Sequence, residues 1–508
     1  MSGQDPLLAA HLGCFAYDAG RPVVRDVSLA LGPGTLTAVL GGSGSGTSTV
    51  AKIITGWALA GGHEALEGHL GLRDAEGVTR VEFRGRPDDP RLSLGAWGRH
   101  VALVPQRAAD LLTGAAATVG EEIAFTLEQH GTARELMRAR VAEAAAAVGL
   151  GAHLERHPAS LSGGEERRLA LACAIVGAPS VLVLDDPTAS LDAAGRGALA
   201  DVLDAQRSAG TAVVVVGSCA DALARTAQHC ILLDGGTVAA EGRSAAVLSS
   251  DAFARSGVLV RDPGDTDREG QRPGEPAPGR PGPPSGPPLA ALGSVTFTYP
   301  GQDRHVLDRA DLSVRAGEVL AITGPNGAGK STALRHLAGI MRPQSGRVDV
   351  LGRDAAAIPA GRVAEHVGTL FQEPRETLFE RTALREVSFG LRTRDRSRAA
   401  RRAAEDGARE ALRAVGLEGA EDTHPYDLSA SAQRLLALAA VLARRPRVLL
   451  LDEPTVGLDR HGLDRLEALV AGAARGGTGV VLSTHSLAWA REHAHRVVAL
   501  VDGRFVPV

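Results

Sequence analysis

The sequence predicts an α/β protein made of two copies of one domain, joined by a linker. Three observations predict this. A set of motifs occurs twice in the same order, a segment rich in proline and glycine separates the copies, and each copy has a glycine-rich loop between a predicted strand and a predicted helix. The expected boundaries are residues 1–258 for the first domain, 259–289 for the linker and 290–508 for the second domain.

Bulk composition excludes several classes of protein. The chain has 508 residues, of which 44% are hydrophobic and 22% charged, as in globular rather than disordered proteins. A net charge of −4 gives no reason to expect a nucleic acid as partner. The four cysteines form no CxxC pair, which suits a reducing cytosol. The sequence shows neither a signal-peptide pattern nor an apolar run near the ~20 residues of a membrane span, so we expect any role at a membrane to depend on a partner.

The internal repeat rests on three pairs of motifs. The segments 181–188 and 448–455, and the segments 161–165 and 428–432, are each 267 residues apart, whereas the glycine loops 41–46 and 324–329 are 283 residues apart. The difference places an insertion of about 16 residues in the first copy. It falls within residues 61–90, where we expect a longer hairpin or loop.

The linker is identified by composition. Residues 261–288 contain nine Pro and six Gly and no large apolar side chain. Such a segment cannot bury enough surface to fold, so we expect a disordered tether between the domains.

Within each copy the expected order is strand, glycine loop, helix, a helix-rich stretch, then strand and helix again. The second copy shows the start of this order most plainly, with a buried strand at Val319–Thr323 and a helix at Ala333–Gly339. The helix-rich stretches are expected within Thr132–Leu150 and Arg392–Leu417.

The loop Gly324–Thr332 of the second copy satisfies the pattern GxxxxGK[ST] between a strand and a helix. Its glycines let the backbone wrap a phosphate, Lys330 places a positive charge on the β- and γ-phosphates, and Ser331 offers a hydroxyl to Mg²⁺. The first copy keeps the glycines but has Thr47 in place of the lysine. A neutral hydroxyl cannot offset the triphosphate charge, so we expect binding through backbone amides without efficient chemistry.

Carboxylates and a histidine follow the later strands. Four apolar residues end in Asp452 and Glu453, of which the first can hold Mg²⁺ through water and the second can orient and deprotonate the attacking water. His485 follows the next strand, from which it can contact the γ-phosphate. The first copy has Asp186, one methylene shorter, at the Glu453 position and Cys219 at the His485 position.

With these motifs, both copies resemble the nucleotide-binding domains of ABC transporters over residues 8–245 and 290–505. The resemblance implies two P-loop domains, each with a RecA-like core and a helical subdomain. It identifies Gln106 and Gln372 as Q-loop residues and the segments 190–192 and 457–459 as D-loops. It also implies that Tyr17 and Tyr299 stack on adenine, although a tyrosine near the start of a domain can equally be part of the core. The signature motif is intact at residues 161–165 and altered at 428–432.

In this family each ATP lies between the phosphate loop of one domain and the signature of the other. The resemblance therefore implies one competent and one degenerate site, because the departures from the family pattern all fall in one of the two. The catalytic residues of the competent site are Lys330, Gln372, Glu453 and His485. Its ATP-binding residues are Tyr299, Gly324, Asn326, Gly327, Gly329, Lys330, Ser331, Thr332, Ser162, Gly163, Gly164 and Asp192. Its Mg²⁺ ligands are Ser331, Gln372 and Asp452. The degenerate site comprises Tyr17, Gly41, Gly44, Gly46, Thr47, Ser48, Thr49, Gln106, Asp185, Asp186, Cys219, Ser429 and Asp459, and its altered signature includes Ala430 and Ser431.

The Q-loop regions narrow the resemblance. The segments 367–379 and 386–390, with their first-copy counterparts 101–106 and 118–125, are similar to the ATPases of energy-coupling factor (ECF) importers of the cobalt and B-vitamin type. That resemblance implies ATP and Mg²⁺ as cofactors, a transmembrane coupling protein and a membrane-embedded substrate-binding subunit as partners, and a position at the cytoplasmic face of the membrane. The alternatives are the ATPase of another transporter type, or an ABC ATPase acting on ribosomes or nucleic acid. Against these stand a linker that is rich in proline and glycine instead of charged and helical, and the lack of zinc-binding cysteine pairs. The segment Arg392–Arg402 is interpreted as a solvated helix face.

Overall fold

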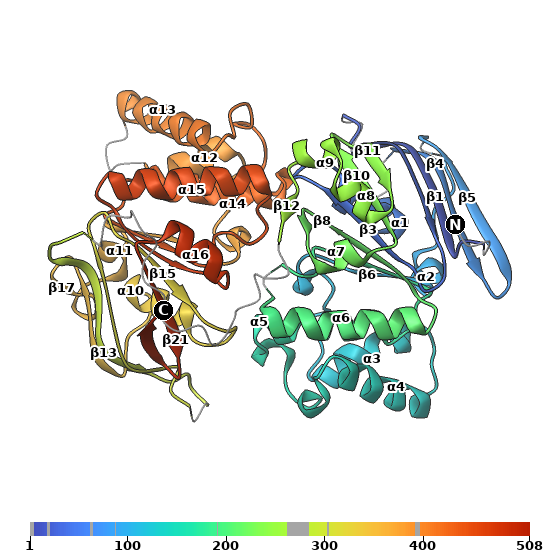
Figure 1. Ribbon diagram of the computed structural model, residues 1–508, viewed down its shortest axis with the longest axis horizontal. Helices are drawn as coiled ribbons and strands as arrows, with labels where there is room; N and C mark the ends of the chain where they lie inside the picture. Colours follow the sequence, from blue (N-terminus) through green and yellow to red (C-terminus); the bar gives the residue numbers. More distant parts are fainter. Residues whose placement is uncertain are drawn as a thin grey trace. The chain divides into compact units, whose positions relative to one another are not determined.

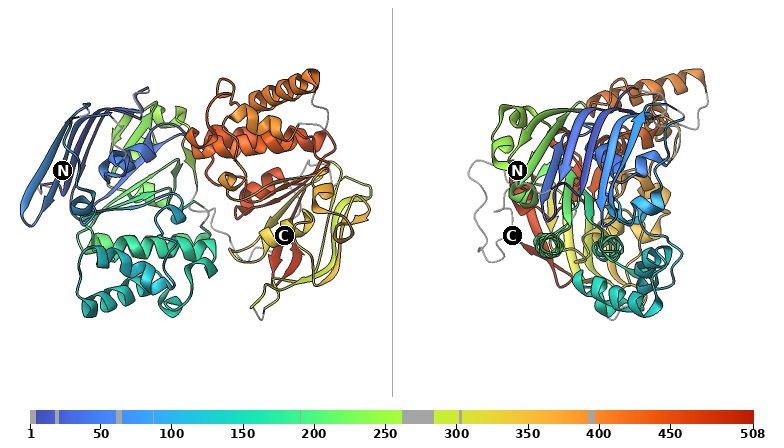
Figure 2. Two further views of the ribbon diagram at one scale, coloured as in Figure 1. Left: turned by 180° about the vertical axis from the view of Figure 1, so that it is seen from behind. Right: turned by 90° about the vertical axis from the view of Figure 1, so that its right-hand side faces the viewer.

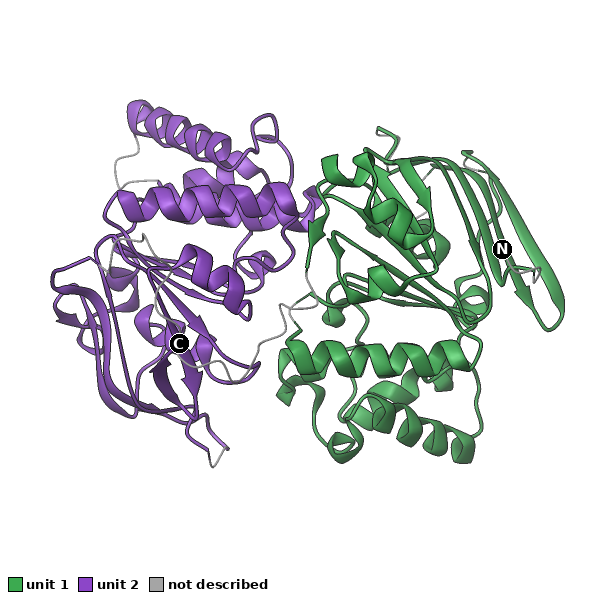
Figure 3. Ribbon diagram, viewed as in Figure 1, with its two compact units in different colours: residues 1–263 green, residues 264–508 purple. Residues whose placement is uncertain are grey.

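The structure is a computed structural model that describes residues 5–17, 21–60, 65–86, 88–189, 191–261, 284–301, 304–391 and 397–508. It divides into two compact units, Met1–Pro263 and Gly264–Val508 (Figure 3). Each unit has its own sheets, helices and hydrophobic core, which confirms the expected pair of α/β domains.

The first unit contains two main sheets (Figure 1). The antiparallel sheet has the order β2-β1-β4-β5, with β1 at Leu8–Ala16, β2 at Val24–Leu31, β4 at Ala65–Asp74 and β5 at Gly77–Arg84. The second sheet has the order β11-β10-β3-β8-β7-β6, with β3 at Leu36–Gly41, β6 at Val101–Val104, β7 at Val181–Asp185, β8 at Ala212–Gly217, β10 at His229–Asp234 and β11 at Thr237–Gly242. All its strands are parallel to their neighbours except β11, which is antiparallel to β10.

The helices of the first unit fall on the two faces of the parallel sheet (Figure 2). The α1 helix follows the glycine loop directly, and α3, α4 and α5 pack against one another as a helical subdomain. The bounds are α1 Thr47–Ile54, α2 Leu94–Trp97, α3 Val119–Gln129, α4 Arg134–Ala147, α5 Gly163–Ile175, α6 Ala193–Ser208, α7 Ala222–Thr226, α8 Ser244–Leu248 and α9 Asp251–Arg255.

The second unit repeats this plan. Its antiparallel sheet has the order β14-β13-β16-β17, with β13 at Pro288–Phe297, β14 at Leu307–Arg315, β16 at Ser345–Val350 and β17 at Arg353–Asp354. Its larger sheet has the order β18-β19-β20-β15-β21-β22, with β15 at Val319–Thr323, β18 at Val367–Leu370, β19 at Val448–Leu451, β20 at Gly479–Ser483, β21 at Arg496–Val501 and β22 at Arg504–Pro507. The helices are α10 Lys330–Leu337, α11 Ala360–Val363, α12 Ala383–Phe389, α13 Arg398–Ala414, α14 Ala430–Leu442, α15 Arg460–Arg475 and α16 Leu487–His493. In the described part of the chain, no helix combines the length and the hydropathy needed to cross a bilayer.

The core of each unit has two layers because strand side chains alternate between faces. In β19, Val448 and Leu450 face the layer shared with the antiparallel sheet and α10. Leu449 and Leu451 face the layer shared with the helical subdomain. The first unit divides β7 in the same way, with Val181 and Val183 on one face and Leu182 and Leu184 on the other. This arrangement explains why these strands appear in the sequence as continuous apolar runs.

The insertion expected within residues 61–90 is a longer hairpin. In the first unit, β4 and β5 pair from Glu67 with Arg84 to Asp74 with Gly77, whereas β16 and β17 of the second unit share only two residue pairs. The additional pairs lengthen the outer edge of the antiparallel sheet in the first unit.

The structure narrows the linker expected at residues 259–289. The strand β12 (Leu259–Val260) pairs with β9 (Cys219–Ala220) of the first unit, and β13 of the second unit begins at Pro288. Both ends of the expected range therefore belong to sheets, because even short apolar or edge segments gain backbone hydrogen bonds beside an existing strand. Residues 262–283 lie outside the described residues.

Candidate nucleotide-binding sites

The phosphate loop of the second copy runs from the carboxyl end of β15 to the first residue of α10. Gly324, Gly327 and Gly329 have φ values of 141°, 77° and 106°, which side chains with a Cβ rarely adopt. At Gly329 a Cβ would also lie 2.6 Å from a methyl carbon of Val306. The loop therefore needs these glycines, and it directs backbone N–H groups and the positive end of α10 toward a site that suits phosphate.

Lys330 opens α10 but turns back over the loop. Its Nζ donates hydrogen bonds to the carbonyl oxygens of Gly324 at 2.8 Å and Pro325 at 3.2 Å, and it lies 3.6 Å from Glu453 Oε1. The side chain is 7% exposed. The ammonium group is thus held at the centre of the loop, where a phosphate would lie.

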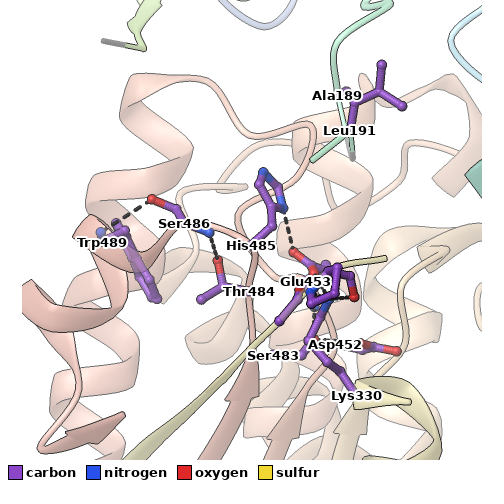
Figure 4. A network of polar contacts seen from close by, with 12 residues as sticks. Ala189, Leu191, Lys330, Asp452, Glu453, Ser483, Thr484, His485, Ser486 and Trp489 are labelled. Atoms are coloured by element: carbon purple, nitrogen blue, oxygen red, sulfur yellow. Dashed lines mark hydrogen bonds and ion pairs between the residues drawn. The ribbon is translucent and has the colours of Figure 1, made fainter. Parts of the chain in front are cut away.

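Glu453 joins Lys330 to His485 (Figure 4). His485 Nδ1 lies 3.0 Å from Glu453 Oε2, and the side chains are 9% and 8% exposed. Burial alone would raise the pKa of Glu453, but the hydrogen bond from His485 and the charges of His485 and Lys330 outweigh it and hold this pKa below its ordinary value. Glu453 is therefore ionised at neutral pH, as a base for water requires.

Asp452 and Glu453 are also connected through a residue that the sequence analysis did not identify. Ser483, the last residue of β20, donates a hydrogen bond to Asp452 Oδ1 at 2.6 Å and accepts one from the Glu453 N–H at 2.8 Å. Ser483 is fully buried. The signal that could have drawn attention to it is the internal repeat, because the matching residue of the first copy, 267 positions earlier, is Val216.

An arginine occupies the same position of the repeat in both copies, and the sequence analysis also missed it. Arg434 in α14 donates to the carbonyl oxygens of Gln372 at 2.8 Å and Glu453 at 3.2 Å. Arg167 in α5 donates to the carbonyl of Gln106 at 3.2 Å and to that of Ala189. Each arginine fastens the Q-loop and the loop after the carboxylate strand to the signature helix. Its position 267 residues from its counterpart is the sequence signal that could have revealed it.

The phosphate loop of the first copy keeps its shape without the lysine. Gly44 and Gly46 have φ values of 79° and 95°, close to those of Gly327 and Gly329. Thr47 opens α1, and Ser48 donates a hydrogen bond to Asp185 Oδ1 at 3.0 Å. The backbone cradle is therefore present, whereas the cation is not.

The two carboxylates of the first copy, Asp185 and Asp186, have a different electrostatic environment from Glu453 of the second copy. Burial, followed by the charge of Asp186, raises the pKa of Asp185 to about 7. Burial also raises the pKa of Asp186, although Arg167 acts in the opposite direction. Gln106 Nε2 donates a hydrogen bond to Asp186 Oδ2 at 3.2 Å. Without counterparts of Lys330 and His485, ionising both carboxylates beside a triphosphate is unfavourable.

Two residues after equivalent strand positions, the second copy has His485 and the first copy has Ser218, so the expected match of Cys219 to His485 is one residue out of register. Cys219 begins the short strand β9. Burial raises the pKa of its thiol to about 12, so the group is neutral at physiological pH. It therefore supplies neither the charge nor the strong hydrogen-bond donor of a histidine.

The two tyrosines occupy equivalent positions over the helices that follow the phosphate loops. Tyr299 Oη lies 3.1 Å from the Thr332 hydroxyl, and Tyr17 donates to the Thr49 hydroxyl at 3.5 Å. Each also packs edge-on against the phenylalanine two residues before it. The tyrosines are thus anchored beside the loops, and stacking on adenine stays a prediction.

The signature motifs form helix N-termini in both units. Ser162 caps α5 in a capping box with Glu165, and Ser429 caps α14 by accepting from the Ala432 N–H. Ser431, which replaces the second signature glycine, is buried and donates to Asp459 Oδ1 at 3.4 Å. The altered signature therefore links to the D-loop of its own unit.

The D-loop aspartates cap the next helices. Asp192 accepts from the Gly195 N–H and Asp459 from the Gly462 N–H, each at 2.8 Å. Ser190 lies outside the described residues. Gln372 is exposed, and its backbone carbonyl accepts the hydrogen bond from Arg434.

Comparisons with known proteins agree with this geometry. The family model described as "ABC transporter" matches residues 24–189 and 307–456. A protein of Methanosarcina mazei, provisionally named an ABC transporter ATP-binding protein, is 30% identical over 96% of this chain and 92% of its own length. A similarly named protein of Streptomyces coelicolor is 32% identical over 96% and 91%.

Solved structures match one domain at a time. A dimeric ATP-binding cassette bound to ADP and phosphate is 27% identical over 43% of this chain and 96% of its own, with a TM-score of 0.40. The protein cbiO1 of Clostridium perfringens, described as part of the ABC transporter complex cbiONQ, is 28% identical over 43% and 87%, also with a TM-score of 0.40. From the paired family match and the full-length relatives, the chain belongs to the ABC transporter family as an ATP-binding, ATP-hydrolysing protein with two ATPase domains.

Proposed function

We propose that this protein is the ATPase subunit of an ECF-type importer, with one ATP site kept for hydrolysis and one degenerate site. The observation that carries the proposal is the cluster of Lys330, Glu453 and His485. Lys330 Nζ lies 3.6 Å from Glu453 Oε1, and His485 Nδ1 lies 3.0 Å from Glu453 Oε2, with all three side chains at most 9% exposed. The first copy has Thr47 and Asp186 at the first two of these positions and no histidine at the third.

The cluster supports hydrolysis through the chain's own groups. The ionised Glu453 carboxylate accepts the proton of the attacking water, and His485 holds that carboxylate in place. Lys330 exchanges its contacts with the loop carbonyls for phosphate oxygens when nucleotide binds.

The residues assigned to Mg²⁺ are Ser331, Gln372 and Asp452. A hydroxyl, an amide oxygen and a carboxylate are the hard oxygen ligands that this ion prefers. When bound, the ion neutralises charge on the β- and γ-phosphates. Asp452 is kept in orientation by its hydrogen bond from Ser483.

The pairing of the domains is inferred from the family. The competent site would then combine the phosphate loop of the second unit with Ser162, Gly163, Gly164 and Asp192 of the first. The degenerate site would combine Thr47, Asp186 and Cys219 with Ala430 and Ser431. ATP would bring the domains together and hydrolysis at the competent site would separate them, which drives a membrane partner.

The ECF assignment rests on the Q-loop segments 101–106 and 367–379 and on the segments 118–125 and 386–390. It implies a transmembrane coupling protein, a membrane-embedded substrate-binding subunit, a micronutrient as cargo and a position at the cytoplasmic face of the membrane.

The experiment that tests the proposal is purification of the tagged chain from its native host, followed by mass spectrometry of bound proteins and by phosphate-release assays. Small polytopic membrane proteins that co-purify at constant ratio support the importer. Ribosomal or DNA-repair proteins in their place would contradict the transport assignment. Turnover that depends equally on Lys330 and Thr47 would contradict the division between the sites.

A further inference from the structure

Ser483 links the two carboxylate residues of the second copy, and its environment makes the link specific. The side chain is fully buried at the end of β20, beside the end of β19. The parallel pairing of Leu451 with Leu482 brings the next residues, Asp452 and Ser483, to the same level of the sheet. The hydroxyl is thus placed by backbone register, without mobility of its own.

The hydrogen bonds of Ser483 have a fixed direction. A backbone N–H can only donate, so the Glu453 N–H gives its proton to Ser483 Oγ. The single hydroxyl proton is then free to go to Asp452 Oδ1, at 2.6 Å. This short bond to a charged oxygen occupies one face of Asp452 and leaves Oδ2 for other ligands.

Glu453 needs such a restraint. Its φ of 46° lies in the left-handed region, which is unfavourable for a residue with a long side chain. The hydrogen bond from its N–H to Ser483 holds this conformation, which in turn aims the Glu453 carboxylate at Lys330 and His485.

The first copy provides a natural comparison. Asp186 has nearly the same φ of 49°, but its N–H donates to the carbonyl oxygen of Val216 at 2.8 Å. Val216 pairs with Val39 as Ser483 pairs with Ile322, so Val216 stands at the strand position of Ser483. Its apolar side chain cannot link the two carboxylate residues by hydrogen bonds.

We propose that Ser483 is a positioning residue for ATP hydrolysis, which fixes Glu453 through its backbone and Asp452 through its carboxylate. The first copy has Val216, which carries no hydroxyl, at the strand position of Ser483, so this link between the two carboxylate residues belongs to the second copy alone. The inference rests on the proposed role of Glu453 as the base.

The test uses the full-length chain with the variants Ser483→Ala, Glu453→Gln and their combination. Single-turnover hydrolysis gives the rate of the chemical step, and titration with a fluorescent ATP analogue gives nucleotide affinity. We expect Ser483→Ala to lower the rate by about tenfold to a hundredfold, as a small misplacement of a reacting group does, with affinity unchanged within about twofold. In the Glu453→Gln background its effect should shrink to about threefold or less, because the two residues act as a unit.

Thr478→Val is the matched control. Thr478 lies directly before the other end of β20 and donates to the carbonyl oxygen of Pro446 at 3.0 Å, so its replacement removes a comparable hydroxyl away from the site. We expect it to leave the rate within about twofold, and Ser483→Thr, which restores the hydroxyl, to recover activity above that of Ser483→Ala.

The outcomes separate the two proposals. If Glu453→Gln retains full turnover, the proposed function fails and the positioning role falls with it. If Glu453→Gln lowers turnover as expected but Ser483→Ala keeps its rate, the positioning role alone is wrong. The same conclusion follows if Ser483→Ala lowers the rate by the same factor with and without Glu453→Gln. A loss in Thr478→Val equal to that in Ser483→Ala would likewise reduce Ser483 to a structural residue.

Discussion

Glu453→Gln is the variant that tests the candidate site most directly. The substitution keeps the size of the side chain and a carbonyl oxygen for His485, but it removes the charge and the ability to take a proton. At an effective dielectric constant of about 20, two unit charges 3.6 Å apart interact by about 4 to 5 kcal/mol before desolvation is subtracted. That attraction, together with the hydrogen bond from His485, keeps the pKa of the buried Glu453 below its ordinary value. The variant loses an ionised base, whereas the phosphate loop stays in place.

We expect Glu453→Gln to lower the rate of hydrolysis without weakening the binding of ATP. Loss of a general base lowers kcat by about 10² to 10⁴, which corresponds to about 2.7 to 5.4 kcal/mol of activation free energy. ATP affinity should not fall, because one negative charge beside the triphosphate has been removed. A coupled phosphate-release assay measures kcat, and equilibrium titration with a fluorescent nucleotide measures affinity.

Asp186→Asn is the matched control, because it makes the same change at the equivalent position of the first copy. If the first site is degenerate, this variant keeps kcat within about threefold of the unmodified protein. The reasoning is refuted if Glu453→Gln retains more than about half of kcat, or if both variants lose it to the same extent.

Three further predictions concern the phosphate loops and a buried histidine. Lys330→Ala should lower turnover by at least about a hundredfold in the phosphate-release assay, and Thr47→Ala by no more than about twofold, since only the former removes a cation from the phosphates; equal losses would contradict the asymmetry. Gly329→Ala should weaken nucleotide binding more than Gly327→Ala. Both glycines have positive φ, but a Cβ would meet Val306 at Gly329 and nothing at Gly327. Equal nucleotide affinities of the two variants in a titration would show that this steric contact does not matter. Burial lowers the pKa of His336 from its ordinary value of 6.5. When the pH falls below 6.5, the unfolded chain takes up a proton at this residue that the folded chain does not, so the free energy of unfolding decreases. When the pH is lowered from 7.5 to 5.5, the decrease in the free energy of unfolding should be smaller in His336→Ile than in the unmodified protein, by at most about 1.4 kcal/mol. Urea unfolding at the two pH values measures this decrease, and equal decreases in the two proteins would contradict the prediction.

Much of the fold was predictable because its signals are local. The strand Val319–Thr323 was predicted with its observed bounds, since a continuous apolar run that leads into a glycine loop fits a buried parallel strand. The spacing of the repeat predicted an insertion within residues 61–90, as a longer hairpin or loop, and the pairing of β4 with β5 shows that it is a hairpin. The linker ends were less predictable, because Leu259–Val260 forms a strand only by pairing with β9, a partner distant in sequence. The helices α4 and α13 lie within the helix-rich stretches expected at Thr132–Leu150 and Arg392–Leu417.

The sequence by itself determined which chemistry each copy could carry. Lys330, Asp452, Glu453 and His485 belong to motifs whose residue types and order are sufficient to identify a nucleotide site, and Thr47 is visible as a departure without any coordinates. Only the tertiary structure decided which groups meet. Ser483 reaches Asp452 and Glu453 because β19 and β20 pair in a particular register, and no spacing rule gives the register of two parallel strands about 30 residues apart. The first unit lacks this link, because the residue at the strand position of Ser483 is Val216, and the Asp186 N–H donates to its backbone carbonyl instead of a hydroxyl.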